Sequence, residues 1–260
     1  MKKVRAKKQL GQHFLKDESV AQQTVDAFGQ NGDFEQAIEV GPGMGVLSKP
    51  LLKRKDLELK VIDIDTESIQ WLKNEGLLRP DQIIEGDFLQ LNLYEFFEQQ
   101  PFGIIGNFPY NISTQILFQA LDNRNYCKEV VGMFQKEVAD RIACQPGSKV
   151  YGITSVLLQA FYDIDYLFTV EAEVFDPPPK VRSAVIRLRR NAVEKLDCNE
   201  KRFRQIVKMA FNQRRKTLRN SLKALLTDEL KQEPIFSKRP EQLSVEDFIQ
   251  LTNKLDAQRG

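Results

Sequence analysis

The stretch that decides the fold is Gly103-Ile-Ile-Gly-Asn-Phe-Pro-Tyr110, an apolar run that leads into an amide, a proline and an aromatic ring. The apolar run predicts a buried strand that ends at the proline turn. The side-chain carbonyl of Asn107 and a turn carbonyl can both accept hydrogen bonds from one amino group, and Tyr110 offers a face for a planar base. A plain strand end with a buried tyrosine explains these residues equally well. The neighbouring strands therefore decide between the two interpretations.

Three earlier apolar segments also end in residues that suit a ligand. The four segment ends, in chain order, are Gly41, Asp63, Asp87 and Asn107. Ligands bind beyond the carboxyl ends of the strands in open α/β sheets, so we expect these residues to line one crevice. Taken singly, each acid is more simply a helix cap or a turn residue. It is the series that predicts an α/β fold with a ligand site.

The two acids suit different parts of a nucleoside. Asp63 follows Gly41 by 22 positions, close to the roughly 20-residue offset at which an acid reaches a ribose in a βαβ unit. Asp87 can accept a hydrogen bond from an adenine amino group, while the next apolar residue, Phe88, would pack on the ring. The spacing therefore predicts that Asp63 binds the ribose and Asp87 the adenine.

A glycine-rich loop, Gly41-Pro-Gly-Met-Gly45, joins the first strand (residues 37–40) to a helix-compatible segment (residues 46–52). Glycine lets the backbone approach a ligand closely, and the following helix would aim its N-terminal amides at that ligand. The spacing differs from the Gly-x-Gly-x-x-Gly of dinucleotide-binding folds. This difference, together with the lack of a histidine suited to hydride chemistry, argues against a nicotinamide-dependent dehydrogenase.

Composition restricts the class of protein. The chain has 260 residues, of which 42% are hydrophobic, enough to bury one large core or two small ones. No apolar run of about 18 residues could span a membrane, and the basic N-terminus leads into no signal-peptide core, so we expect a cytoplasmic protein. Three scattered cysteines and a single histidine predict neither a disulfide framework nor a metal site.

The net charge of +2 conceals two concentrated basic segments. Residues 1–16 hold six Lys or Arg and residues 201–223 hold nine, and neither segment holds an Asp or Glu. The rest of the chain is net acidic. Basic segments on an acidic body predict binding of phosphates, and therefore of nucleic acid. A solvated helix face together with a flexible tail is the alternative explanation.

The pattern changes from strands to helices around residues 191–199, which predicts a domain boundary there. We expect a catalytic domain over residues 1–190, with a basic N-terminal arm, and a helical RNA-binding domain over residues 191–260. Apolar stripes at helical spacing occur from Phe203 to Phe211 and from Leu218 to Leu226, and residues 243–255 predict a closing helix. Between the two stripes, Arg214-Arg-Lys216 is predicted to lie at a helix start, where guanidinium groups suit phosphate contacts.

Two loops could contact a substrate. Phe175-Asp-Pro-Pro-Pro-Lys-Val181 is stiffened by three prolines and could present Phe175 as a second stacking surface, although a buried plug explains that ring as well. Pro146-Gly-Ser-Lys-Val-Tyr-Gly152 could be mobile, and a purely structural loop is an equal alternative. Residues 182–189 alternate apolar and polar side chains, which predicts a half-buried strand.

Five segments together resemble the ribosomal RNA small-subunit adenine dimethyltransferases. They are Leu10-Gly-Gln-His-Phe-Leu15, Glu39-Val-Gly-Pro-Gly43, Gly106-Asn-Phe-Pro-Tyr110, Pro177-Pro-Pro-Lys180 and Ala210-Phe-Asn-Gln-Arg-Arg-Lys-Thr-Leu-Arg-Asn-Ser-Leu222. The likeness covers nearly the whole chain. It implies a Rossmann-like, S-adenosylmethionine-dependent methyltransferase sheet with a small all-helical C-terminal domain.

The resemblance also implies the reaction. The family methylates N6 of two adjacent adenosines near the 3′ end of small-subunit (16S) rRNA, giving N6,N6-dimethyladenosine during small-subunit biogenesis. The implied methyl donor is S-adenosylmethionine, which leaves as S-adenosylhomocysteine, and no metal is implied. We expect the partner to be small-subunit rRNA or a pre-30S particle and the protein to act as a monomer, without a membrane.

Individual site residues follow from the matched motifs. The implied cofactor contacts are His13, Leu15, Gly41, Asp63, Asp87 and Asn107. The predicted catalytic residues are Asn107, Pro109, Tyr110 and Phe175. The predicted RNA-binding residues are Arg214, Arg215, Lys216 and Arg219. The sequence departs from the family pattern at Phe108, where Leu is commoner, and at Asp63, where the usual Glu has a longer reach.

The residues suggest how a methyl group reaches adenine N6. Asn107 and the backbone carbonyl of Phe108 or Pro109 would accept from N6 and favour a more pyramidal nitrogen, while Tyr110 and Phe175 would sandwich the base. The base must first leave its stack, as in other enzymes that act on a base. The N6 proton can leave to water after transfer, so no histidine base is required.

Three other functions fit part of the pattern. The 23S rRNA adenine methyltransferases and the DNA adenine methyltransferases use a similar Asn-x-Pro-Tyr turn, but the Asn212–Leu222 run and the Pro146–Gly152 loop argue against both. A ribosome-assembly factor that only binds RNA is a further alternative. The presence of Asn107, Pro109 and Tyr110 argues against that loss of activity.

Overall fold

The computed structural model describes residues 4–258, which form two compact units. The first runs from the start of the described chain to Ala139 and includes Asp163–Arg190, whereas the second comprises Asp140–Tyr162 and the chain from Asn191 onward. A boundary after residue 190 agrees with the change of pattern in the sequence. Residues 140–162, expected in the catalytic domain, instead cluster with the C-terminal helices. There, helix α7 (Ile153–Gln159) packs against α8 and α10.

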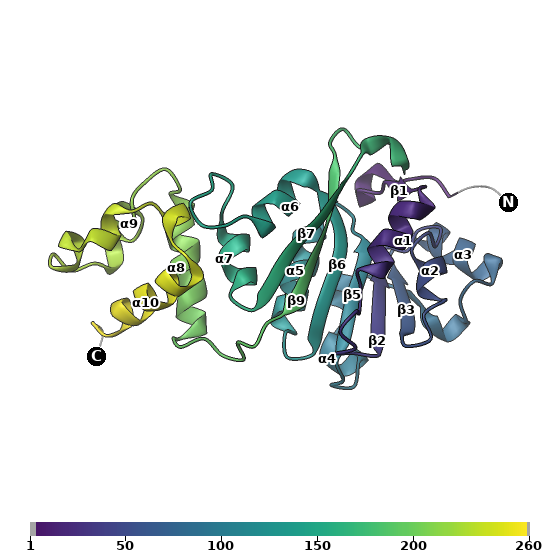
Figure 1. Ribbon diagram of the computed structural model, residues 1–260, viewed down its shortest axis with the longest axis horizontal. Coiled ribbons are helices and arrows are strands. Elements are labelled where there is room, and N and C mark those ends of the chain that lie inside the picture. Colours follow the sequence, from purple (N-terminus) through teal and green to yellow (C-terminus); the bar gives the residue numbers. More distant parts are fainter. Residues whose placement is uncertain (1–3, 259–260) are drawn as a thin grey trace. The chain divides into compact units, whose positions relative to one another are not determined.

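The first unit is built on one seven-stranded sheet, so the predicted α/β fold is confirmed (Figure 1). In spatial order its strands are β4 (Ile83–Glu85), β3 (Glu58–Asp63), β2 (Gln36–Val40), β5 (Phe102–Asn107), β6 (Cys127–Gln135), β9 (Ser183–Arg190) and β7 (Tyr162–Val170). The first five strands are parallel, and β9 pairs antiparallel with β6.

The strand order reverses between β2 and β5. From β2 the chain proceeds outward to β3 and β4, and it then returns to place β5 on the other side of β2. Loops that leave adjacent strands in opposite directions open a crevice at the carboxyl ends of those strands. Gly41 follows β2 directly and Asn107 ends β5, so the topology puts these two residues on either side of the crevice.

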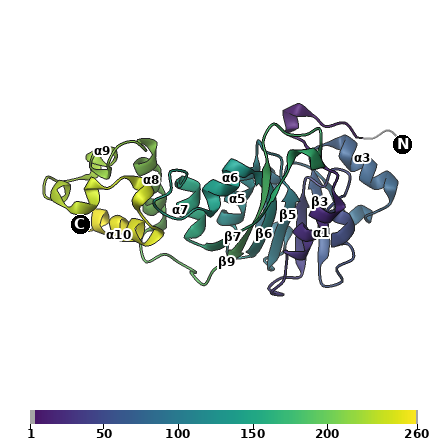
Figure 2. The same ribbon diagram turned by 45° about the horizontal axis from the view of Figure 1, so that its top comes forward.

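A short N-terminal segment forms part of a second, two-stranded sheet. After a 3₁₀ turn (η1, Lys8–Leu10), strand β1 (Phe14–Leu15) pairs antiparallel with β8 (Phe175–Asp176). In Figures 1 and 2 this purple segment runs along the upper edge of the sheet. We call residues 4–16 the N-terminal arm. It leads into α1 (Glu18–Asp26), whose first turn is capped by the Asp17 carboxylate.

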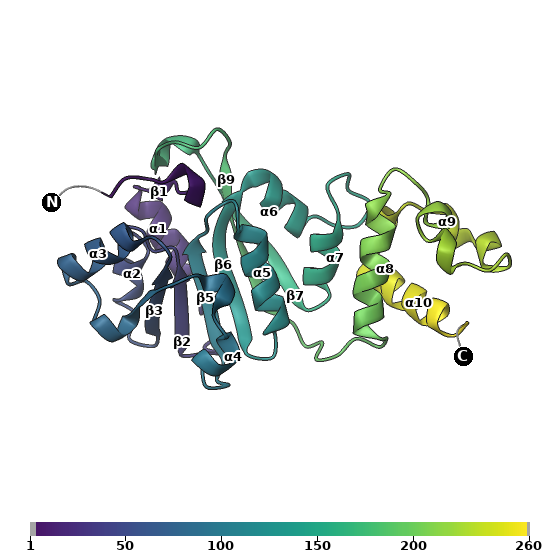
Figure 3. The same ribbon diagram turned by 180° about the vertical axis from the view of Figure 1, so that it is seen from behind.

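Helices cover both faces of the sheet. Helix α1 lies over one face, and α5 (Ser113–Asp122) lies over the other, where Figure 3 shows it in front of β6. The remaining helices of this unit include α2 (Ser48–Leu51), α3 (Thr66–Glu75) and α4 (Leu93–Phe96). The core beneath α1 joins its Val25 to Ile105 and Val131 of the central strands. Burial of apolar area on both faces is the main term that stabilises this unit.

The strand predicted over residues 182–189 is confirmed as β9, but the expected alternation is wrong for its first half. Ala184, Val185 and Ile186 are consecutive and all fully buried. From Arg187 onward the alternation appears, because Leu188 is buried while Arg187 and Arg189 are partly exposed.

Helices make up most of the second unit. Its helices are α7, α8 (Glu200–Asn212), α9 (Leu218–Ser221) and α10 (Val245–Asp256), and the last residues of α6 (Lys136–Ala143) also belong to it. The predicted stripe on α8 is confirmed, because Phe203, Ile206 and Val207 are buried. Helix α10 begins after Ser244, which forms a reciprocal cap with Asp247.

The arginine cluster does not lie at a helix start. Helix α8 ends at Asn212 and α9 begins at Leu218, so Arg214, Arg215 and Lys216 lie in the turn between them. Residue 217 has the non-helical conformation of a helix cap. Among residues 4–258, no helix is both long and apolar enough to cross a bilayer.

Candidate functional site

One cavity opens at the reversal of strand order, with a volume of about 180 Å³. The predicted residues that line it are His13, Gly41, Asp63, Asp87, Asn107, Pro109 and Tyr110. The expected convergence of four strand ends with Tyr110 is therefore confirmed. It follows from parallel pairing, because parallel strands place all their carboxyl ends at one edge.

The glycine loop after β2 lies close to the other walls of this cavity. Gly41 and Gly43 have φ angles of 71° and 54°, a region that residues with a side chain rarely adopt. A Cβ on Gly43 would lie 2.8 Å from the Phe14 ring, and one on Gly41 would lie 3.5 Å from the Pro109 ring. Only glycine allows the loop to pass between the arm and the Asn107–Tyr110 turn.

Asp63 is a buried acid at the end of β3. Burial raises its pKa to about 6, although hydrogen bonds from the backbone N–H groups of Asp65, Gly43 and Ile64 partly offset that effect. The Asp65 N–H donates to Asp63 Oδ1 at 2.9 Å. A carboxylate held in this way can accept from ribose hydroxyl groups, and it is ionised above about pH 6.

Asp87 lines the cavity and also caps a turn. Its Oδ1 accepts from the Leu89 N–H at 2.9 Å, at the start of a 3₁₀ turn (η3, Phe88–Gln90). The simple interpretation of this acid as a cap is thus correct, and it is compatible with a second role for the other oxygen. Phe88 is buried, and Leu89 lines the cavity instead, so the expectation that Phe88 packs on an adenine is wrong.

The Asn107 amide has a defined orientation. Its Nδ2 donates to the His13 carbonyl at 2.8 Å. This bond assigns the other amide atom, Oδ1, as an acceptor available toward the cavity. Sequence reasoning identified Asn107 but not this partner, because a backbone carbonyl leaves no signal in the sequence.

Tyr110 is held on two sides. Its hydroxyl is 2.6 Å from Ser183 Oγ, and its ring stacks on the His13 ring with centroids 5.2 Å apart. His13 in turn donates from Nδ1 to the Pro177 carbonyl at 2.7 Å, since a carbonyl can only accept. One face of Tyr110 is therefore occupied by protein, which leaves the other for a base.

Phe175 and Leu15 do not line this cavity. They are paired between β8 and β1, with exposed fractions of 0% and 4%, and both belong to the hydrophobic core. The prediction that Phe175 supplies a second stacking surface is wrong for this conformation, because the ring has no exposed face. The alternative, a buried plug before the prolines, describes it correctly.

Several wall residues were missed by sequence reasoning. They are Leu10, Gly11, Gln12, Phe14, Ile64, Leu89, Asn111 and Ile112. Ile64 is 54% exposed, and its place between two acids directly after a strand end was a usable signal in the sequence. The arm residues stand in the Leu10–Leu15 segment quoted for the resemblance, but their place at the cavity depends on the pairing of β1 with β8, far along the sequence.

The basic residues of the two segments differ in whether they bind other groups of the protein. Residues 1–3 of the expected phosphate-binding tail lie outside the described residues, and Lys7 forms ion pairs with Asp65 and Glu67. In the second unit Arg214 donates to the carbonyls of Lys149 and Tyr151. The remaining predicted RNA-binding side chains, Arg215, Lys216 and Arg219, are exposed.

Side chains suited to a metal are dispersed. Within residues 4–258 there is no group of three or more His, Cys, Asp or Glu placed to hold a metal ion. The three cysteines, Cys127, Cys144 and Cys198, form no disulfide bond with one another.

Two solved structures share this architecture. A dimethyladenosine transferase from Plasmodium falciparum superimposes with a TM-score of 0.77 at 24% identity, covering 95% of this chain and 98% of that one. The 23S rRNA methyltransferase ErmE gives a TM-score of 0.72 at 22% identity, covering 94% and 99%. At these identities the likeness concerns the fold alone.

Sequence relatives are much closer. The chain is 57% identical to the ribosomal RNA small subunit methyltransferase A of Cytophaga hutchinsonii, over 98% of this chain and 99% of the relative. It is 56% identical to the protein of the same name from Flavobacterium johnsoniae, over 99% and 98%. The family model described as ribosomal RNA adenine dimethylase matches residues 3–257. The chain therefore belongs to the ribosomal RNA adenine dimethylase family.

Proposed function

We propose that this protein transfers methyl groups from S-adenosylmethionine to N6 of two adjacent adenosines near the 3′ end of small-subunit rRNA, giving N6,N6-dimethyladenosine. The observation that carries the proposal is the Asn107 amide, which lines the cavity and whose nitrogen is held by the His13 carbonyl, so that its oxygen is left as an acceptor. Family membership supports the choice of substrate. The protein would act as a monomer on rRNA or on a pre-30S particle, in the cytoplasm.

The walls of the cavity fit the methyl donor. Asp63 would accept from the ribose hydroxyls and Asp87 from the adenine amino group, while Ile64 and Leu89 offer apolar surface to the adenine ring. The backbone at Gly41 would approach the amino-acid end. His13 and Asn107 would line the same pocket, and a contact from Leu15 would come from its backbone because its side chain is buried. When bound, the donor supplies a methyl group on a positively charged sulfur.

The target base would be recognised at the Asn107–Tyr110 turn. Asn107 Oδ1 and one turn carbonyl accept from N6, which concentrates the nitrogen lone pair on the side facing the methyl group. The Pro109 carbonyl already accepts from the Ile112 N–H at 3.1 Å, so the Phe108 carbonyl is the better second acceptor. The base stacks on the face of Tyr110 that His13 leaves open. A proton leaves N6 to water once the new N–C bond forms.

The decisive variant is Asn107→Ala. We expect it to lower methyl incorporation by about 10²–10³ or more, because the N6 acceptor is lost from the reacting centre, and to leave RNA binding unchanged. Labelled methyl incorporation and filter binding measure the two quantities, and Asn31→Ala, at an exposed position outside the cavity, is the control. Activity within about tenfold of the wild type would contradict the assignment.

The substrate is tested separately. Incorporation into small subunits, large subunits and DNA distinguishes the proposal from 23S rRNA and DNA adenine methylation. Digestion of the labelled RNA then identifies the nucleoside and its position. Efficient RNA binding without any incorporation would instead support a pure assembly factor.

A further inference from the structure

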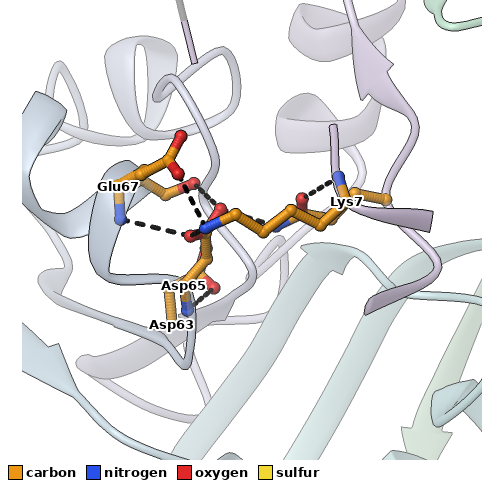
Figure 4. Close-up of polar contacts among 6 residues, drawn as sticks. Lys7, Asp63, Asp65 and Glu67 are labelled. Atoms are coloured by element: carbon orange, nitrogen blue, oxygen red, sulfur yellow. Dashed lines mark hydrogen bonds and ion pairs between the residues drawn. The ribbon is translucent and has the colours of Figure 1, made fainter. Parts of the chain in front are cut away.

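The carboxylate of Asp65 lies at the centre of a polar cluster beside the cavity (Figure 4). Its side chain is fully buried, yet it receives the Lys7 ammonium, the Gln12 amide at 3.0 Å and the Ser68 hydroxyl at 3.1 Å. It also accepts from the Glu67 N–H at 3.1 Å as the cap of α3. Two of these donors come from the N-terminal arm, more than 50 positions away in sequence.

This cluster connects directly to a wall of the cavity. The Asp65 N–H donates to Asp63 Oδ1 at 2.9 Å, so the residue that anchors the arm also orients the proposed ribose-binding carboxylate. Burial raises the pKa of Asp65, but the hydrogen bonds from Lys7 and Gln12 outweigh it and leave the pKa below its ordinary value. The carboxylate is therefore ionised at neutral pH and attracts the Lys7 ammonium.

From Lys7, the residue bound to Asp65, the arm continues to the cavity. The Lys7 N–H donates to Gln12 Oε1 at 2.8 Å, which closes the segment between them into a compact loop. Gly11 has a φ of 64° at the turn of that loop, and residues 10–14 line the cavity. His13, which follows Gln12, holds the Asn107 amide through its backbone carbonyl. Loosening the arm at Lys7 would thus reach both Asp63 and Asn107.

We propose that Lys7 and Gln12 are positioning residues that clasp the N-terminal arm to Asp65 and thereby hold the cofactor wall of the cavity in its binding geometry. The inference rests on the proposed function, because it assigns the bound molecule as S-adenosylmethionine or its product. It also changes the role expected for one basic residue of the arm. Lys7 serves the protein's own carboxylates, while Arg5 and Lys8 are exposed.

The test compares Lys7→Met with Lys8→Met, since both remove one positive charge from the arm and only the first breaks the clasp. Calorimetry with S-adenosylhomocysteine should show about tenfold weaker binding for Lys7→Met, because the arm loses its ion pair with the buried Asp65 carboxylate. Lys8→Met should match the wild type. The KM for the methyl donor should rise and kcat should fall by a smaller factor, because the arm also holds the Asn107 amide through the His13 carbonyl. Lys7→Arg should recover most of the affinity.

Two further measurements separate the clasp from general loss of structure. Amide exchange at Leu10 and Gly11, whose N–H groups bond to the carbonyls of Lys7 and Lys8, should speed up in Lys7→Met while the β5 amides stay protected. Gln12→Met should weaken binding in the same direction, and the double variant should lose less than the sum, because both changes open one clasp.

Several results would overturn the inference. Equal S-adenosylhomocysteine affinity for Lys7→Met and wild type would do so, as would a fall in RNA affinity shared by Lys7→Met and Lys8→Met, which would make Lys7 a phosphate contact. Failure of the proposed function would show in the wild-type protein and not only in the variants. In that case the wild-type protein itself would not methylate small-subunit RNA or would not bind S-adenosylhomocysteine.

Discussion

At the scale of single residues, orientation depends on partners far away in sequence. Asn107 owes the direction of its amide to the His13 carbonyl, 94 positions earlier. Tyr110 is fixed by Ser183, 73 positions later. An asparagine or tyrosine on a mobile turn would lose much of its benefit, since a reacting atom must be held within a fraction of an ångström. These partners are backbone or small polar groups, which is why the motif is recognisable while its support is not.

Asp63 predicts a pH dependence of cofactor binding. Because its pKa is raised to about 6, protonation below that pH removes a charged acceptor for the ribose hydroxyls. Affinity for S-adenosylhomocysteine should therefore fall as the pH decreases from 7 to 5. Asp63→Asn should bind weakly at every pH and show no such slope. Calorimetry across that range measures both, and an unchanged slope in Asp63→Asn would assign the titration to another group.

The same shift has a consequence for stability. The pKa of an unfolded aspartate lies near its ordinary value of 3.8, whereas folded Asp63 stays protonated up to about pH 6. Between these values the folded state binds more protons, so its contribution to the free energy of unfolding decreases as the pH rises. Ionising Asp63 thus lowers the free energy of unfolding, a cost that is expected where a buried acid serves binding.

At the scale of elements, the site depends on the close approach of β5 and β6. Gly106 and Gly132 face the Phe108 ring, which is 1% exposed. A Cβ on Gly132 would lie 2.0 Å from that ring. The two glycines therefore leave the space that the ring fills, and the ring anchors the turn that carries Asn107 and Tyr110. This packing accounts for the phenylalanine at position 108.

Gly132→Ala tests this packing. Overpacking should destabilise the protein by about 1–3 kcal/mol and lower methyl transfer by moving the Asn107–Tyr110 turn. Gly86→Ala is the control for stability, because a Cβ there meets nothing within 4 Å. Adding Phe108→Leu to Gly132→Ala should restore part of the melting temperature. A Gly132→Ala protein with wild-type melting and activity would show that the ring can move without cost.

At the scale of the whole molecule, two units divide the chemistry of the chain. The first holds the cavity and the second carries the exposed cations of the α8–α9 turn. Basic residues that already serve the protein are poor phosphate ligands, and Lys7 and Arg214 are of this kind. Phosphate binding is expected instead from exposed guanidinium and ammonium groups.

The triple variant Arg215→Gln, Lys216→Gln, Arg219→Gln should weaken RNA binding and reduce the slope of log affinity against log salt by roughly 2–3, as three phosphate contacts are lost. Its affinity for S-adenosylhomocysteine should equal that of the wild type. Arg214→Gln is the matched contrast: it should leave most of the salt slope intact but lower the melting temperature, because the Lys149 and Tyr151 carbonyls lose their donor. Equal slopes for the triple variant and wild type would refute the RNA contact.

Local chemistry alone was enough to predict much of this molecule. Apolar runs that end in Gly41, Asp63, Asp87 and Asn107 determined parallel strands with their functional ends at one edge, because side-chain periodicity and strand-terminating residues act over a few positions. Helical stripes determined α8 and α10 in the same way. These features require no knowledge of which segments meet.

Only the tertiary structure decided which groups meet across long separations. It buried Phe175 against Leu15, assigned Arg214 to backbone carbonyls, and clasped Lys7 to Asp65. Each outcome depends on desolvation and on distances between segments far apart in the chain, and a list of residues carries neither. Residue types and local spacing thus determined the chemistry available to this protein, and the packing of the folded chain decided which of those groups remain exposed to a ligand.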